Sequence, residues 1–375
     1  LARTFSVLGI KTKHIYKVDS RSCVITLPTT KNAATSSSVF HRAVPPSLDS
    51  AAMRRLPILL GMGVLMAFAA PRKRGGRRRF IEDAMQVPLI AKLFDGAIDI
   101  IGDVHGEIGA LRALLGRLGY DGNGGHPDGR RVVFVGDLVD RGPDSPSVLR
   151  LVRRLVARGV AQCILGNHEL NLMRGSRRHG NLWFWGETET LRKGEGGAWP
   201  QALFTSGPER REALAFLGSL PLALEREDVA VVHAAWQPAS VERLRATRAN
   251  DAAAAVGEFE EEVALSIRRR RLDRTSQRGR DEIGLLEQNG NPVKVATSGL
   301  EGYAPRPFFA SGRWRTLERI RWWESAPPPP GRLVVVGHFW RRFMGEIRAG
   351  QQNFTPSGPD MFPGYRPEQL LGPGK

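Results

Sequence analysis

Three short polar motifs, each placed directly after an apolar run, carry the residues that could do chemistry in this chain. The motifs are Gly102-Asp103-Val104-His105-Gly106, Gly136-Asp137-Leu138-Val139-Asp140-Arg141-Gly142 and Gly166-Asn167-His168-Glu169. Carboxylates, imidazoles and amide oxygens are ligands of divalent metal ions in proteins. The order and spacing of the motifs therefore predict a hydrolytic site built around two metal ions.

Two later histidines add imidazoles to this set. His233 follows the apolar run 229–232, and His338 follows the apolar run 333–337. One histidine after an apolar run is a weak signal, but the three motifs still need imidazole ligands. The predicted metal ligands are therefore Asp103, His105, Asp137, Asn167, His233 and His338. Because no thiolate is among them, the site favours Mn, Fe or Zn over Mg or Ca.

The other polar residues of the motifs suit the hydrolysis of a phosphate ester. We expect Asp137 to bridge the two ions, with an attacking hydroxide held between them. His168 would face the substrate as the general acid for the leaving group, and Asp140 would keep it protonated. Arg141 would clamp phosphate oxygens, the alternative being a surface ion pair. For Glu169 we expect a buried hydrogen bond to the backbone and no part in catalysis.

The elements that must position these residues alternate between strands and helices. Apolar runs predict strands at 97–101, 131–135 and 162–165, and helix-spaced apolar residues predict helices at 107–118 and 145–158. This order is typical of parallel strands joined by right-handed crossovers. Ligands of such sheets bind beyond the carboxyl ends of the strands, which is where all three motifs fall.

The three motifs closely resemble the signatures of calcineurin-like metallophosphoesterases, in the phosphoprotein phosphatase branch that also includes bacterial diadenosine tetraphosphatases. The similarity extends from about Ile98 to Gly372. It implies an α/β fold, a four-layer α/β/β/α sandwich whose second sheet is expected from the resemblance alone. It also implies one ion held by Asp103, His105 and Asp137, and a second held by Asp137, Asn167, His233 and His338. His168 and Asp140 would be the acid pair, with Arg141 on the phosphate.

The chain departs from that pattern in three places. Ala234 and Ala235 follow His233 where the family has two glycines, so a positive φ there would be strained. Phe339-Trp340 follows His338, where protein phosphatases usually have Thr. The second phosphate-binding arginine of the family has no clear match, and Arg313, Arg315 and Arg321 are the candidates.

Composition divides the chain into three parts. Residues 1–52 are rich in Ser and Thr and nearly free of acids, so we expect a disordered, transit-like or spurious extension. Residues 53–79 join an apolar run at 56–70, too short to cross a bilayer as a helix, to a dense basic linker. Residues 80–375 would be the catalytic domain, with a helical cap or insertion at about 241–330 that contains a helical stretch at 241–274 and a loop-rich segment at 289–307. A cytoplasmic location is favoured, with membrane association through 56–70 or organelle targeting as alternatives.

Charge and cysteine content narrow the class of protein. The chain has 55 Lys and Arg against 38 Asp and Glu, a net charge of +17, with basic runs at 72–79 and 268–271. We expect these runs to be solvated, and we expect no nucleic-acid partner because no aromatic residues interleave them. Two cysteines cannot form a disulfide framework, which suits a reducing compartment, and Cys163 would be a core thiol.

The substrate is the open part of the functional prediction. The leading hypothesis is a two-metal phosphoesterase acting on phosphomonoesters of a protein or a small molecule. The second is hydrolysis of a dinucleoside polyphosphate of the diadenosine tetraphosphate type. Tryptophans 183, 185, 314, 322, 323 and 340 could stack on its bases, although core packing explains most of them. An inactive scaffold and a nuclease are the less favoured alternatives.

Overall fold

The structure is a computed structural model of the chain. It describes residues 6–8, 14–18, 22–27, 87–178, 180–188, 201–204, 206–310, 313–325 and 332–339. All of these belong to one compact unit, which comprises Leu1–Lys31 and Met85–Lys375. The apolar run 56–70, the basic run 72–79 and Trp340 lie outside the described residues. Among the described helices, none combines the length and apolar character that crossing a bilayer requires.

The first sheet carries the three motifs. Its order is β2-β3-β5-β6-β7, with β2 (His14–Val18), β3 (Ser22–Leu27), β5 (Ile98–Ile101), β6 (Arg131–Phe134) and β7 (Ala161–Cys163). β5, β6 and β7 pair in parallel, as the alternating element order predicts. The crossover helices are α1 (Ile108–Arg117) and α2 (Ser145–Ala157). The predicted strands and helices of this region are confirmed within a few residues.

Local sequence explains where α2 begins and which side it buries. The side chain of Asp144 accepts a hydrogen bond from the backbone N–H of Ser147 at 2.8 Å, and Pro146 lies in the first turn. Both features satisfy the start of a helix, where backbone N–H groups lack partners within it. One face of α2 then packs in the core through Val148, Leu149, Leu151, Val152 and Leu155.

The second sheet, which was expected from the resemblance alone, is present. Its order is β1-β12-β9-β8-β4, with β1 (Ser6–Leu8), β4 (Ile90–Lys92), β8 (Ala223–Glu225), β9 (Val229–Val232) and β12 (Leu333–Val336). β9 and β12 pair in parallel, so His233 and His338 leave the same edge of this sheet. The two late histidines are thereby placed as a pair.

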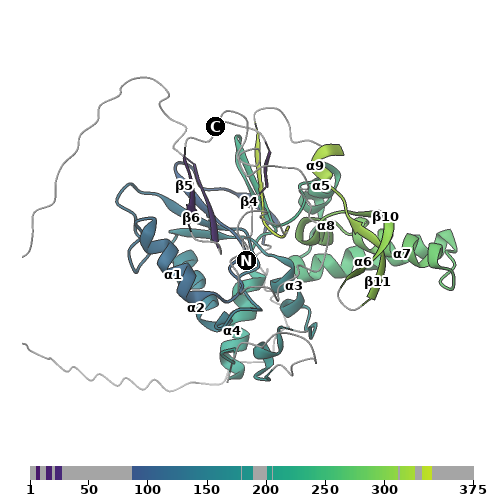
Figure 1. Cartoon of the computed structure of the whole chain (residues 1–375), viewed down its shortest axis with the longest axis horizontal. Helices are drawn as coiled ribbons and strands as arrows, with labels where there is room; N and C mark the ends of the chain where they lie inside the picture. Colours follow the sequence, from purple (N-terminus) through teal and green to yellow (C-terminus); the bar gives the residue numbers. More distant parts are fainter. Residues whose placement is uncertain are drawn as a thin grey trace, which may run out of the picture. The chain divides into compact units, whose positions relative to one another are not determined.

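Two apolar clusters separate the layers. The smaller cluster lies between the sheets and takes alternate residues of facing strands, including Ile98, Ile100, Val133, Val229 and Val335. The larger cluster takes the opposite faces of the same strands and the helices that cover them. α1 and α2 lie against the first sheet, and α5 (Pro238–Ala246) and α8 (Pro292–Ser298) lie on the side of the second (Figure 1). The fold is therefore the expected α/β sandwich of two sheets between helices.

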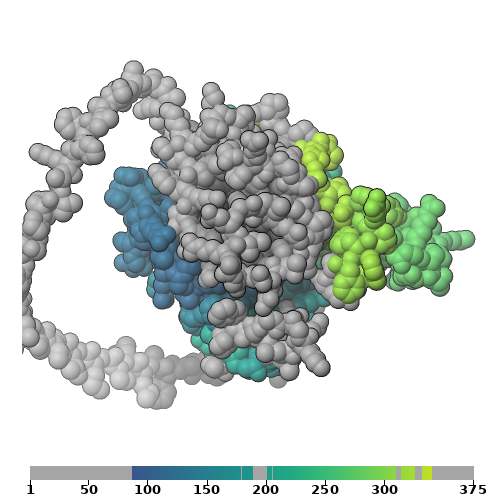
Figure 2. All heavy atoms as spheres, in the orientation of Figure 1, coloured from purple at the N-terminus to yellow at the C-terminus, as the bar shows by residue number. Residues whose placement is uncertain are grey.

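The insertion at about 241–330 is not purely helical. The single helical stretch expected at 241–274 is two helices, α5 and α6 (Ala252–Arg270), because the side chain of Asp251 accepts a hydrogen bond from the backbone N–H of Ala254 and starts a new helix. α7 (Gln277–Asn289) follows. With the hairpin described next, α6 and α7 lie together to one side of the sandwich (Figures 1 and 2).

The loop expected at 289–307 is a wrong prediction. Buried Asn291 caps α8 by accepting from the backbone N–H of Val293 at 3.1 Å, and Glu301 then begins a long hairpin. Its strands are β10 (Glu301–Ala310) and β11 (Arg313–Arg319), and a bulge between Tyr303 and Phe308 takes up the prolines that had suggested a loop. The remaining elements are α3 (Asn167–Met173), η1 (Leu182–Trp185), α4 (Gly207–Gly218) and α9 (Trp322–Ser325).

The N-terminal residues also differ from expectation where they are described. The composition of residues 1–52 predicts no regular structure, but β3 pairs antiparallel with β5, and β1 pairs antiparallel with β12. β3 reads Ser-Cys-Val-Ile-Thr-Leu, a run with the β-branched residues that favour strands. Pairing with β5 also covers a sheet edge whose backbone groups would otherwise lack partners.

Candidate metal centre

Five strand ends meet at one place in the fold. Asp103 and His105 follow β5, Asp137 follows β6, Asn167 follows β7, His233 follows β9 and His338 follows β12. The structure thus brings all six predicted ligands together from both sheets. Asp137 lies in two neighbouring donor groups, one with His105 and His168 and one with His233 and His338.

The first group surrounds the Nε2 atom of His105. Oδ2 of Asp137 lies 3.7 Å from it and Oδ2 of Asp103 lies 4.0 Å from it. With metal–ligand bonds of about 2.0–2.2 Å, two donors of one ion can be at most about 4.4 Å apart. The Nδ1 atom of His105 lies 2.8 Å from the carbonyl oxygen of Val139. Donating a proton there would leave Nε2 unprotonated, so that its lone pair could bind a metal.

The second group surrounds the other side of Asp137. Nε2 of His233 lies 3.4 Å from Oδ2 of Asp137, and Nδ1 of His338 lies 2.9 Å from Oδ1 of Asn167. The Nδ1 atom of His233 lies 2.7 Å from the carbonyl oxygen of Val135, which directs Nε2 into the site as for His105.

Within the described residues, the Nε2 atom of fully buried His233 makes no hydrogen bond of acceptable geometry, although Oδ2 of Asp137 lies 3.4 Å away. A buried polar atom without a partner is rare, because it loses its water and gains nothing in return. A cation beside Asp137 would supply the missing partner. The donors present therefore fit two divalent ions.

His168 lies beside the first group, and its ring faces that group. Its Nε2 atom is 3.9 Å from Oδ2 of Asp137, and its ring meets that of His105 edge-on at 4.7 Å between centroids. Its Nδ1 atom is 2.6 Å from Oδ2 of Asp140. Nε2 is thus the atom that faces the shared centre.

Arg141 lies between the two imidazoles of this group. One guanidinium nitrogen is 3.1 Å from Nε2 of His105, and another is 3.2 Å from Nε2 of His168. The planar fork therefore reaches the centre that Asp137 defines, which is where an anionic substrate would be held.

The pKa values of these groups follow from burial and from each other. Burial alone would raise the pKa of Asp137, but the charges of His233 and His168 hold it well below its ordinary value. Burial alone would lower the pKa of His233, but Asp137 outweighs this effect and raises it to about 9. The pKa of His168 is likewise raised, because the Asp137 charge and the Asp140 hydrogen bond outweigh burial. Burial and the charge of His233 both lower the pKa of His338.

Backbone strain concentrates in the site. Six described residues other than glycine have a positive φ, and five of them are His105, Asp137, Asp140, Arg141 and His338. Such a φ is uncommon for side chains other than Asn, Asp and His, and it persists where the surrounding fold over-determines it. Ala234 and Ala235 are not among the six, so the strain considered for that pair is not found.

Glu169 explains how two of the strained loops keep their shape. Its buried carboxylate accepts hydrogen bonds from the backbone N–H groups of Asp137, Leu138 and Gly166 at 2.8 to 2.9 Å. Burial and the Asp137 charge raise its pKa to about 7. The expected buried hydrogen bond to the backbone is present, and it joins the second motif to the third.

Two residues near the site were not assigned by sequence reasoning. The charge of Arg319 lowers the pKa of His338, whereas Arg321 pairs with Glu324 at 3.0 Å. Arginines occupy positions 313, 315 and 319, which alternate as the residues on one face of a strand do. This pattern could have indicated Arg319 from the sequence. Buried Trp183 donates its indole N–H to Asp140 at 2.7 Å, a contact that no sequence pattern announces.

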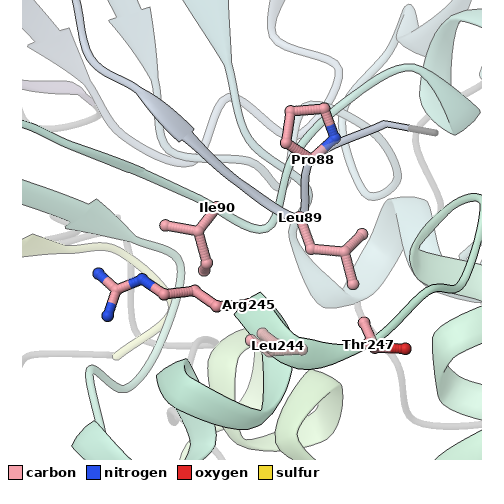
Figure 3. A pocket seen from close by; sticks show the side chains of 6 residues that line it. All are labelled: Pro88, Leu89, Ile90, Leu244, Arg245 and Thr247. Carbon is pink, nitrogen blue, oxygen red and sulfur yellow. The ribbon is translucent and has the colours of Figure 1, made fainter. Parts of the chain in front are cut away.

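A separate hollow in the fold lacks this chemistry. A cavity of about 270 Å³ lies between β4 and α5 and is lined by Pro88, Leu89, Ile90, Leu244, Arg245 and Thr247 (Figure 3). Arg245 is its only charged side chain, and it pairs with Glu225 and Glu242. The cavity offers no group that would ligate a metal or attack a substrate.

Comparison with known proteins agrees with this geometry. Residues 96–247 match the model of the calcineurin-like phosphoesterase family. The chain is 51% identical over 79 residues to the asymmetrical bis(5'-nucleosyl)-tetraphosphatase PrpE of Halalkalibacterium halodurans, which covers 20% of this chain and 32% of that protein. It is 35% identical over 149 residues to the symmetrical bis(5'-nucleosyl)-tetraphosphatase of Aromatoleum aromaticum, covering 38% and 45%. The chain thus spans less than half the length of these relatives.

Two solved structures also match parts of the chain. The crystal structure of a putative diadenosine tetraphosphatase matches with 27% identity and a TM-score of 0.29, covering 40% of this chain and 55% of that one. A cold-active protein-tyrosine phosphatase of a Shewanella species matches with 18% identity and a TM-score of 0.31, covering 56% and 60%. From the family match, the chain contains a calcineurin-like metallophosphoesterase domain at residues 96–247.

Proposed function

We propose that this protein hydrolyses phosphoric esters and anhydrides with two divalent metal ions, and that dinucleoside polyphosphates are its preferred substrates. One observation carries the reaction class. A single oxygen of Asp137 lies 3.7 Å from a nitrogen of His105 and 3.4 Å from a nitrogen of His233, so one carboxylate serves both donor groups. A shared carboxylate between two ion sites is the arrangement that a two-metal hydrolase needs.

The donor set assigns residues to the two ions. Asp103, His105 and Asp137 would hold the first ion, and Asp137, Asn167, His233 and His338 would hold the second. When bound, the ions would polarise the phosphoryl oxygens and lower the pKa of an attacking water. Mn, Fe or Zn fits the mixture of oxygen and nitrogen donors better than Mg or Ca.

The protein's own residues would orient the substrate and manage the proton. The guanidinium of Arg141, which lies between His105 and His168, would donate to phosphoryl oxygens and hold the phosphorus in line. With Arg141 turned from Nε2 of His168, 3.2 Å away, to the phosphoryl oxygens, His168 would carry a proton on Nε2 and donate it to the departing oxygen. Asp140, 2.6 Å from Nδ1, favours the protonated ring and fixes its orientation.

The proposed substrate differs from the one that the sequence alone placed first. Phosphomonoesters were the leading hypothesis, with dinucleoside polyphosphates second. Two curated relatives with 51% and 35% identity in the matched region are named tetraphosphatases. We therefore place a nucleoside–polyphosphate–nucleoside first and keep a phosphomonoester as the second candidate.

A substrate panel tests this proposal. Purified full-length protein is loaded with Mn, Fe, Zn or Mg and assayed on diadenosine tetraphosphate, p-nitrophenyl phosphate and a phosphopeptide, with Asp137→Asn as the control. We expect the highest kcat/KM on diadenosine tetraphosphate. Chromatography of the nucleotides then separates symmetrical cleavage, which gives two ADP, from asymmetrical cleavage, which gives ATP and AMP.

The other outcomes are equally informative. A higher kcat/KM on p-nitrophenyl phosphate or the phosphopeptide would show that a phosphomonoester, and not a dinucleotide, is the preferred substrate. No turnover of any substrate with any of the four metals would overturn the proposed function as a whole.

A further inference from the structure

The two carboxylate oxygens of buried Asp140 have different partners. Oδ2 lies 2.6 Å from Nδ1 of His168, and Oδ1 accepts the indole N–H of Trp183 at 2.7 Å. Asp140 is 2% exposed and Trp183 is 0% exposed. The bond to Trp183 is buried and the bond to His168 is part-buried, so the first is shielded from water and stronger than its equivalent on the surface.

Trp183 is itself held in one orientation. Its ring contacts those of Phe184 and Phe204, with centroids 5.7 and 5.4 Å away. The backbone N–H of Phe204 donates to the carbonyl oxygen of Trp183 at 3.1 Å, and the N–H of Ala202, from the same segment, donates to Pro143 at 2.8 Å. The indole is therefore fixed relative to the loop that carries Asp140 and Arg141.

Asp140 has little else to fix the plane of its carboxylate. Its backbone is in the left-handed region with φ of 70°, and its N–H group donates to the side chain of Ser145 at 2.9 Å. The terminal torsion of an aspartate is broad, so the backbone does not decide where the two oxygens point. The hydrogen-bond partners decide it, and among the described residues these are Trp183 and His168.

We infer that Trp183 is a positioning residue for the general acid and acts on His168 through Asp140. Its N–H occupies one carboxylate oxygen, which leaves the other directed at Nδ1 of His168 and so aims Nε2 at the departing oxygen. The full burial of Trp183 also removes it from the tryptophans that could stack on a nucleobase. The inference rests on the proposed function, because it concerns how the leaving group of that reaction is protonated.

The matched comparison is between a poor and a good leaving group. A misaligned general acid slows the departure of a basic oxygen more than that of an acidic one. In Trp183→Phe, which keeps an aromatic ring but loses the N–H, we expect kcat on phenyl phosphate to fall about tenfold or more. On p-nitrophenyl phosphate kcat should fall much less, and KM should stay the same for both substrates.

Three further measurements separate positioning from packing. Phe184→Leu removes a ring from the same cluster without touching Asp140, and it should keep the wild-type ratio of the two rates. Benzothienylalanine placed at position 183 keeps the bicyclic shape and replaces the N–H by sulfur, so it should reproduce the selective loss in a normally folded protein. In an Asp140→Ala background, Trp183→Phe should cause no further loss.

The results that would overturn the inference are distinct from those that would overturn the function. An active wild type whose position-183 variants lose equally on both leaving groups, or lose nothing, contradicts the positioning role alone. A wild type without turnover on phenyl phosphate or on any substrate of the panel, diadenosine tetraphosphate included, contradicts the proposed function and the inference with it.

Discussion

Asp137 is the residue on which the two donor groups depend. Its side-chain oxygen lies within 3.9 Å of nitrogens from His105, His168 and His233, and the residue is 2% exposed. Its backbone is also held at a φ of 49°, between loops that Glu169 joins. A change of one oxygen here therefore alters both ion sites at once.

Replacing Asp137 by Asn should abolish both metal loading and turnover. The amide cannot bridge two cations as a carboxylate does, and it removes the negative charge that balances the histidines. Elemental analysis of the purified variant after incubation with Mn, beside wild type and Arg278→Gln as an exposed control, measures this. Wild-type metal content in the variant would contradict the bridging role.

Replacing His168 by Ala should leave metal loading intact while lowering kcat by about 10² to 10⁴-fold, the usual contribution of a general acid. His168 is not one of the six predicted ligands, and the acid matters most when the leaving oxygen is basic. The loss should therefore be smaller on p-nitrophenyl phosphate than on phenyl phosphate. An equal loss on both esters would argue against proton donation by His168.

At the scale of elements, the site is made of loops that leave neighbouring strands and approach each other closely. Gly166 is one example, because a Cβ atom built there would lie 2.3 Å from Oδ1 of Asp137. At Gly337 the equivalent distance to Oδ1 of Asp103 is 2.4 Å. Glycine at these strand ends is therefore a requirement of the space around the ligand carboxylates.

A methyl group at Gly166 should displace Asp137 and disable the site. We expect Gly166→Ala to lose most metal binding and to lower kcat/KM at least a hundredfold, about 3 kcal/mol of transition-state stabilisation. Gly116→Ala in α1, where nothing lies within 4 Å of the new atom, is the matched control. It should keep full activity and gain up to about 1 kcal/mol of stability. Similar kinetics for the two variants would show that the loop at Gly166 shifts to accommodate the methyl group without disturbing Asp137.

At the scale of the whole molecule, the metal centre joins the two sheets. Asp103, His105, Asp137 and Asn167 follow strands of the first sheet, and His233 and His338 follow strands of the second. Ions bound by both sets would link the sheets directly, in addition to the apolar layer between them. The folded state should therefore gain stability from metal, by an amount that rises with the logarithm of the free ion concentration above Kd.

Metal removal should lower the thermal unfolding temperature. At a free ion concentration of about 100 times Kd, one site stabilises the folded state by about 2.7 kcal/mol. Calorimetry of the full chain with Mn and with a chelator measures the shift. The same pair of scans on Asp137→Asn is the control and should coincide. A wild-type unfolding temperature that is unaffected by the chelator would contradict a centre that bridges the sheets.

Local sequence was sufficient for the parts of this protein that depend on near neighbours in the chain. The strand–helix–strand order of residues 98–163, the parallel pairing, the motifs at the strand ends and the buried role of Glu169 could all be predicted, because periodicity and caps are local signals. The cytoplasmic location, the roles of the individual site residues and the boundaries at 52, 79 and 241 stay predictions.

Tertiary structure decided the rest, because those features depend on residues far apart in sequence. The pairing of β3 with β5 and β1 with β12, the β10–β11 hairpin in place of a loop, and the nearness of Arg319 to His338 all join distant segments. So does the hydrogen bond from Trp183 to Asp140 across 43 positions. A one-dimensional pattern records which groups are available, but only packing in three dimensions determines which of them meet.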